Sequence, residues 1–118
     1  MENIGNVVWF DLAVTDFNKA KIFYSELFGW KFEPMGDSYL MITAGKEMIG
    51  GLRKAKTVRA STDAPVLYIG VDKLDSALER AKRLGGTLMG EKVKTGDEGV
   101  YHLFKDADHN VVGIWAKS

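Results

Sequence analysis

The chain contains no cysteine, and this absence excludes disulfide bonds, thiolate nucleophiles and cysteine-ligated metal sites. Basic and acidic residues number 16 each, so no net field attracts nucleic acid or an anionic membrane. No apolar run approaches the roughly 20 residues that a membrane-spanning helix needs, and the N-terminal stretch lacks a basic leader. We therefore expect a cytoplasmic protein with neither a nucleic-acid nor a membrane partner.

The hydrophobic residues present are arranged in the same order of elements twice. VVWFDLAV alternates like a strand, a helix with Phe17, Ala20, Phe23, Tyr24, Leu27 and Phe28 on one face ends at Gly29, and WKFEPM, SYLMIT and EMIGGLRK read as strands. PVLYIGV, a helix from Asp72 to the stop at Gly85-Gly86, and then TLMGEKV, GVYHLFK and NVVGIWA repeat that order. A shift of 57 positions aligns the helices, and a shift of 62 aligns IGGL with VVGI.

This repeat predicts an α+β fold of two β-α-β-β-β modules within a single domain. Module one covers about residues 5–53, a polar linker covers about 54–64, and module two covers about 65–117. With 118 residues, of which 46% are hydrophobic, the modules must share a core.

The segments VTDFNKAKIFYSELFGW and KDADHNVVGIW resemble the vicinal oxygen chelate superfamily, which includes glyoxalase I, bleomycin-resistance proteins and extradiol dioxygenases. The resemblance covers essentially the whole chain. It implies that the strands curve into an open cup that binds a small molecule, and that the protein is a homodimer.

The family's metal ligands map by motif spacing onto Trp9, Gly51, Val66 and Gly113. Divalent metals are bound by imidazole or carboxylate donors, and none of these four side chains supplies one. The sequence therefore predicts a cup that keeps the family's shape without its metal, and we expect no cofactor. A bulge or close strand packing is a second explanation for the two glycines.

Strand alternation predicts which side chains face the cup and which pack under the helices. The expected lining is largely aromatic and apolar, which favours a planar or hydrophobic ligand. Its members are Trp9, Asp11, Tyr39, Met41, Ile49, Gly51, Arg53, Val66, Tyr68, Tyr101, Leu103, Gly113 and Trp115.

Asp11 is the most informative polar residue, because a carboxylate on a core strand must be paired, solvated or protonated. A structural role predicts an ion pair with Arg53 or hydrogen bonds to a loop. A functional role predicts contact with a ligand's donor group or general-base catalysis, which makes Asp11 the one candidate catalytic residue.

Both histidines are expected to be structural. The repeat places His102 on the helix side of its strand, and His109 occupies a turn position with positive φ. The D-x-D-x-N pattern of that turn differs from a calcium loop, because Val111 and Lys117 replace the glycine and the glutamate.

Three functions are consistent with these residues. The first is a metal-independent protein that binds a small apolar or aromatic molecule without turning it over. The second is a lyase- or dioxygenase-type enzyme of the same superfamily that uses Asp11 alone or displaced metal ligands such as Asp11, Glu47 and His102. The third is a dimeric regulatory module in which the cup is vestigial.

Overall fold

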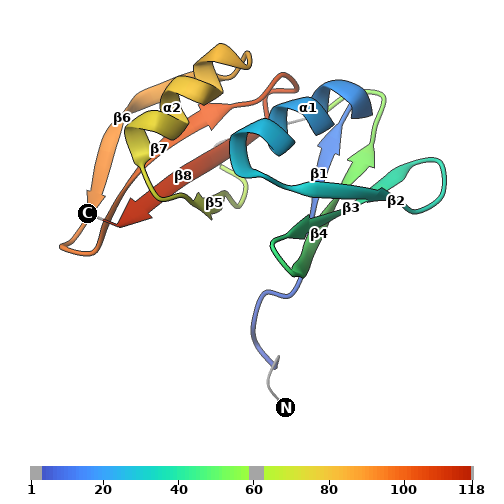
Figure 1. Ribbon diagram of the computed structural model, residues 1–118, viewed down its shortest axis with the longest axis horizontal. Coiled ribbons are helices and arrows are strands. Elements are labelled where there is room, and N and C mark those ends of the chain that lie inside the picture. The colour runs from blue at the N-terminus through green and yellow to red at the C-terminus, as the bar shows by residue number, and fades with distance from the viewer. Residues whose placement is uncertain (1–3, 59–62, 118) are drawn as a thin grey trace.

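The computed structural model describes residues 4–58 and 63–117 and confirms the predicted order of elements (Figure 1). None of the described helices is long and apolar enough to cross a membrane. The elements are β1 (Phe10–Val14), α1 (Phe17–Phe28), β2 (Lys31–Pro34), β3 (Tyr39–Ala44), β4 (Glu47–Lys54), β5 (Leu67–Gly70), α2 (Leu74–Arg83), β6 (Thr87–Thr95), β7 (Gly99–Lys105) and β8 (Val111–Lys117).

Each module builds a mixed four-stranded sheet with the same topology. The strand orders are β1-β4-β3-β2 and β5-β8-β7-β6, in which the first strand runs parallel to the last and the other neighbours are antiparallel. The α+β fold of two repeated modules is thus confirmed. β1 and β5 pair on one side only, because the two sheets are separate, and each strand therefore presents a free edge.

The helix boundaries follow from local chemistry. The Asp16 side chain caps α1 by accepting a hydrogen bond of 3.1 Å from the Lys19 N–H, and Gly29 ends the helix with a left-handed φ of 74°. α2 begins after Lys73, two residues later than Asp72, and Gly85 follows its end with a φ of 100°. Both glycine stops were correctly predicted from the sequence.

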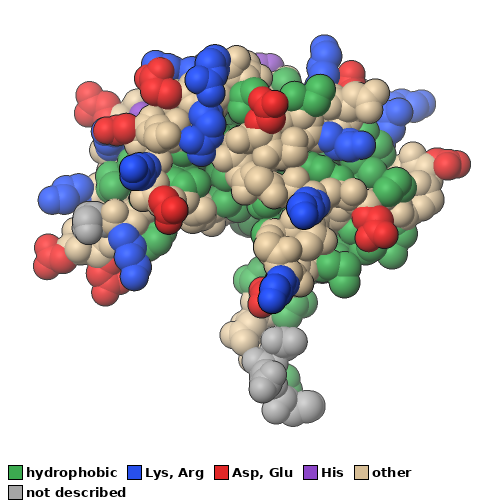
Figure 2. Space-filling view, viewed as in Figure 1, with side chains coloured by type: hydrophobic (Ala, Val, Ile, Leu, Met, Phe, Trp, Pro, Cys, Tyr) green, Lys and Arg blue, Asp and Glu red, His purple; other side chains and the backbone are tan. Residues whose placement is uncertain are grey.

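The two modules share one hydrophobic core. α1 packs against α2, and the ring of Phe23 on α1 lies 5.8 Å from the ring of Phe104 on β7. Trp30 stacks on Tyr24 at 5.3 Å, which fixes the start of β2 against α1. Figure 2 shows acidic and basic side chains interspersed on one face of the molecule, which agrees with the balanced composition.

The turn between β7 and β8 is held by the carboxylate of Asp106. Its Oδ1 accepts hydrogen bonds of 2.9 Å from the backbone N–H groups of Asp108 and Asn110. His109 adopts a φ of 66°, as predicted for this turn position. The D-x-D-x-N pattern therefore specifies a structural turn.

The same turn fastens module two to module one. Tyr24 of α1 donates a 2.6 Å hydrogen bond to Asp106 Oδ2, and Thr15 Oγ1 donates a 2.6 Å bond to Asp108 Oδ1. The Asn110 side-chain amide donates to the carbonyl of Ala13 on β1 at 2.7 Å. Tyr24 and Asp106 are both buried, so their bond is made away from water, where an unpaired polar group is expensive.

We expect Tyr24→Phe to lower the free energy of unfolding by about 1.5–3 kcal/mol, because it removes a hydrogen bond to a buried charged group. Burial raises the pKa of Asp106, and the bond from Tyr24 opposes that rise. A group with a raised folded-state pKa contributes stability below its unfolded pKa of about 3.9, and this is lost as pH rises through the folded pKa. Losing the Tyr24 bond raises that pKa further, so the deficit is larger at neutral pH.

Urea denaturation at neutral and acidic pH measures this deficit. Ser25→Ala is the matched control, since it also removes a hydroxyl from α1 but one that bonds to the nearby Ile22 carbonyl and is exposed. A deficit that stays constant with pH would contradict the role assigned to Asp106.

Candidate functional site

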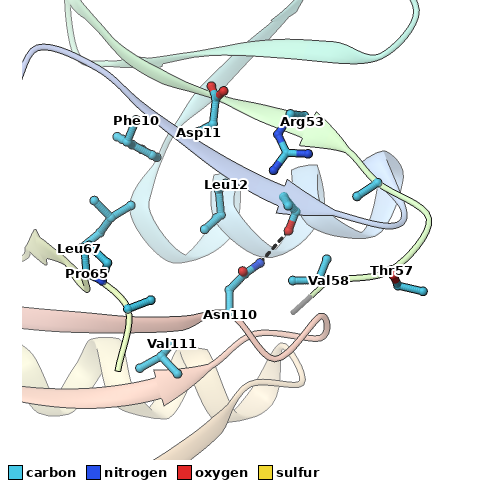
Figure 3. A pocket seen from close by; sticks show the side chains of 13 residues that line it. Phe10, Asp11, Leu12, Arg53, Thr57, Val58, Pro65, Leu67, Asn110 and Val111 are labelled. Atoms are coloured by element: carbon cyan, nitrogen blue, oxygen red, sulfur yellow. Dashed lines mark hydrogen bonds between the residues drawn. The ribbon is translucent and has the colours of Figure 1, made fainter. Parts of the chain in front are cut away.

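β1 has two chemically different faces, as its alternation predicts. Leu12 and Val14 are buried in the shared core, whereas Asp11 is exposed and Trp9 retains 39% exposure. Figure 3 shows the Asp11 carboxylate pointing to the opposite side of β1 from the Leu12 side chain. The face that carries Asp11 is called the cup face below, and the same name is used for the matching face of the second sheet.

A chain of two hydrogen bonds joins three side chains on the cup face of module one. The Trp9 indole N–H donates to Tyr39 Oη at 2.7 Å, and the Tyr39 hydroxyl donates to Asp11 Oδ1 at 2.6 Å. Desolvation, followed by the hydrogen bond to Asp11, raises the pKa of Tyr39. Tyr39 therefore remains a neutral donor at physiological pH.

Gly51 permits this arrangement because the Tyr39 ring lies directly over it. A Cβ atom at position 51 would overlap the ring and hydroxyl of Tyr39. Gly51 is opposite Met41 in the β3–β4 register and opposite Asp11 in the β1–β4 register, so the three strands meet at this point. The glycine is thus required by close packing, which was the second explanation derived from the sequence.

Module two repeats this packing with a different partner. A Cβ atom at Gly113 would overlap the Tyr68 ring, and Tyr68 is directly opposite Gly113 in the β5–β8 register. The rings of Tyr68 and Tyr101 meet edge to face with centroids 4.9 Å apart. Desolvation, followed by the proximity of Tyr101, raises the pKa of Tyr68. Trp115 lies in the same way over Gly99.

The two cup faces are therefore similar in packing, although the ring over the glycine comes from β3 in module one and from β5 in module two, and they differ in chemistry. At the repeat offsets of 57 and 62, Tyr39 corresponds to Tyr101 and Gly51 to Gly113. Asp11 corresponds to Tyr68, and Arg53 corresponds to Trp115. Module one thus carries both charges of the predicted lining, and the lining of module two is uncharged, with Tyr68, Tyr101 and Trp115 as its aromatic members.

The remaining predicted lining residues take simpler positions. Met41, Leu103 and Trp115 are half-buried, and Val66 lies just before β5. Ile49 falls at the irregularity of the β3–β4 pairing, where the register shifts, and it both packs against the core and lines a shallow depression beside Trp9.

The expected ion pair between Asp11 and Arg53 is not formed. In the described part of the chain, Asp11 has Tyr39 as its side-chain partner instead, and no ion pair links it to a basic residue. Both side chains line a cleft of about 590 Å³ between β1 and β5, with Asn110 and Pro65 on the opposite wall (Figure 3). The tyrosines of the cup faces are outside this cleft.

The residues present do not fit the metal site of the resembled family. Trp9, Gly51, Val66 and Gly113 offer no side-chain donor for a divalent ion. His102 is 6% exposed and its Nδ1 lies 2.9 Å from the Leu103 carbonyl oxygen, so it packs on the core side as predicted.

The displaced ligand set is not assembled either. Within residues 4–58 and 63–117, no three His, Cys, Asp or Glu side chains come together in a way that could hold an ion. A site built from Asp11, Glu47 and His102 is therefore absent from the described part of the chain.

Two modules of this topology, with a cup on the sheet faces turned away from the helices, define one class of protein. The chain belongs to the Glyoxalase/Bleomycin resistance protein/Dioxygenase superfamily, whose family model matches residues 6–114. CFP32 of Mycobacterium bovis is 30% identical over 94% of this chain, although the match spans only 45% of CFP32. A glyoxylase-like domain-containing protein of Didymella fabae is 25% identical over 93% of this chain and 92% of that protein.

Solved structures share the fold at low sequence identity. A family member from Burkholderia phytofirmans has a TM-score of 0.75 and 17% identity, covering 95% of this chain and 98% of that one. FosX of Listeria monocytogenes, crystallised as an E126Q mutant with Mn(II) and a dihydroxypropylphosphonic acid, has a TM-score of 0.76 and 19% identity. That match covers 97% of this chain and 91% of FosX and shows the fold alone.

We expect Gly51→Ala to displace the Tyr39 ring, because the new methyl group would occupy the space of the phenol. Both hydrogen bonds of the Trp9–Tyr39–Asp11 chain should then break, and the free energy of unfolding should fall by about 1–3 kcal/mol. The Trp9 indole N–H resonance in NMR spectra and urea denaturation report these two effects.

Gly70→Ala is the matched control on β5. A Cβ atom there meets nothing within 4 Å, so this variant should retain both the resonance and the stability. An unshifted Trp9 resonance in Gly51→Ala would contradict the proposed packing of Tyr39 over the glycine.

Proposed function

We propose that the protein binds a small apolar or aromatic molecule on its cup faces without the metal that the family usually uses. The observation that carries this proposal is the replacement of side chains at two of the family's ligand positions by glycine, each covered by a tyrosine ring. The rings of Tyr39 and Tyr68 take the volume in which a metal ligand would stand. What remains is an aromatic surface with few polar groups, which is the usual composition of a small-molecule site.

We further propose that a second copy of the chain completes the cup. β1 and β5 each have a free edge, and sheets with free edges are normally covered by pairing. The residues that lead into β1 expose apolar side chains, with Val7 at 89% and Val8 at 59% exposure, and Met48 of β4 is 59% exposed. Joining β1 of one copy to β5 of the other would bring the cup face that carries Asp11 and Arg53 next to an aromatic cup face.

We also propose that the protein is cytoplasmic, and the absence of cysteine supports this location. An enzyme based on Asp11 and a purely regulatory dimer remain the competing functions. A retained ligand would favour the proposed binding protein over the regulatory dimer. Chemical conversion of that ligand would favour the enzyme over the binding protein.

Native mass spectrometry of gently purified protein is expected to show a retained small molecule that denaturation releases. Incubation with zinc, nickel or manganese should add no stoichiometric metal, because the cup lacks imidazole and clustered carboxylate donors. One tightly held ion for each chain would contradict the metal-independent site. Unfolded and refolded protein, free of the retained molecule, is the reference for the mass difference.

Two substitutions that introduce a charge, at side chains with the same exposed fraction, test the dimer. We expect Val8→Glu to weaken self-association about tenfold or more, because it places a charge where β1 would meet the second copy. Ile22→Glu on α1 is the control, since Ile22 is also 59% exposed but lies on a helix. Sedimentation equilibrium reports both, and equal dissociation constants would contradict this interface.

A further inference from the structure

Among the residues that the structure describes, Asp11 is a carboxylate without a cationic partner. Its Oδ1 accepts the Tyr39 hydroxyl, and within residues 4–58 and 63–117 its Oδ2 receives no hydrogen bond from the protein. Arg53, the basic residue of the predicted lining, does not form an ion pair with it. An aspartate that is exposed on a cup face and half-satisfied has an acceptor oxygen available for a ligand.

The hydrogen bonds around Asp11 run in one direction and use the donors of Trp9 and Tyr39. The indole of Trp9 has a single N–H, which is given to Tyr39, and the phenol of Tyr39 has a single O–H, which is given to Asp11. The groups that remain are carboxylate lone pairs and the electron-rich faces of aromatic rings. These groups accept hydrogen bonds and attract positive charge, whereas Arg53, the other charged residue of the lining, keeps its own N–H donors.

The equivalent positions of module two have no ionised group. Tyr68 stands where module one has Asp11, and Trp115 stands where module one has Arg53. Tyr68 is 48% exposed, so its ring is available to a flat apolar surface. Module one therefore offers a carboxylate at the position where module two offers an aromatic ring.

We propose that the ligand is an organic cation of the arylalkylammonium type, with its ammonium group on Asp11 and its aromatic ring on the cup-face aromatics. This inference rests on the proposed function and adds the charge and the polarity of the ligand. The ammonium donates to Asp11 Oδ2 and lies against the faces of Trp9 and Tyr39. The ring stacks on the aromatic residues of module two, brought by the second copy.

Three probes of similar size and different charge test this inference. They are 2-phenylethylamine, 2-phenylethanol and 3-phenylpropionate, titrated into the full chain at physiological salt and followed by NMR. The amine should bind most tightly and the propionate most weakly. Asp11→Asn should weaken amine binding about three- to tenfold, as expected for an exposed ion pair with a cation–π contribution, and leave the alcohol nearly unchanged.

Two further variants keep the test decisive. Glu26→Gln removes an exposed carboxylate from the outer face of α1 and should leave all three affinities unchanged. Arg53→Gln should leave amine binding intact or strengthen it, because it removes a competing positive charge. Circular dichroism confirms that each variant is folded before titration.

Two results would overturn the cation site while leaving the aromatic site in place. One is equal binding of the three probes with no effect of Asp11→Asn. The other is preferential binding of 3-phenylpropionate that disappears in Arg53→Gln, which would make Arg53 the recognition residue for an acid. Failure of all three probes to bind would overturn the proposed function as well.

Discussion

The buried carboxylate of Asp106 is the contact on which the arrangement of the two modules depends. It organises the turn before β8 through two backbone bonds and receives the Tyr24 hydroxyl from α1. The turn is thereby held against the end of β1, where Asn110 donates to the Ala13 carbonyl. Because the core is shared, this one polar cluster sets how β1 and β5 stand relative to each other.

That placement leaves a cleft between β1 and β5, so the two cup faces of one chain are not joined into a continuous sheet. Each cup face carries a tyrosine ring packed over a glycine, and in the proposed dimer each face forms half of a site. Glycine here is a specific requirement, since only the absence of a Cβ allows the ring to lie flat on the strand. In the proposed metal-free cup, the two glycines at the family's ligand positions are therefore also the residues that let the tyrosine rings lie on the strands.

The structural features that could be predicted from the sequence are those that depend on local periodicity. The repeated order of elements, the stop at Gly29, the alternation of β1 and the core-side position of His102 all follow from spacing, because strand and helix periods decide which side chains are buried. The family resemblance supplied the ligand positions that glycine and apolar residues now occupy. These features need no knowledge of distant contacts.

What the sequence left open depends on contacts between distant residues. Tyr24 and Asp106 are 82 positions apart, and no local pattern pairs them. The choice of Tyr39 over Arg53 as the partner of Asp11 depends on a tyrosine ring that leans across Gly51, which strand alternation does not specify. The separation of the two sheets depends on contacts between the modules, namely the Asp106 cluster and the packing of α1 against α2, which neither module encodes by itself.

Divergence between the modules is more informative about function than their similarity. Packing constraints explain why Tyr39 and Tyr101, or Gly51 and Gly113, are the same at equivalent positions. They do not explain the aspartate at position 11. A tyrosine there would compete with Tyr39 for the space over Gly51, since its equivalent Tyr68 covers Gly113, but an apolar residue would avoid that competition without a charge to solvate. Asp11 is a carboxylate on an aromatic surface, and the neighbouring donors of Trp9 and Tyr39 are already used in hydrogen bonds. The physical complement of such a group is a cation.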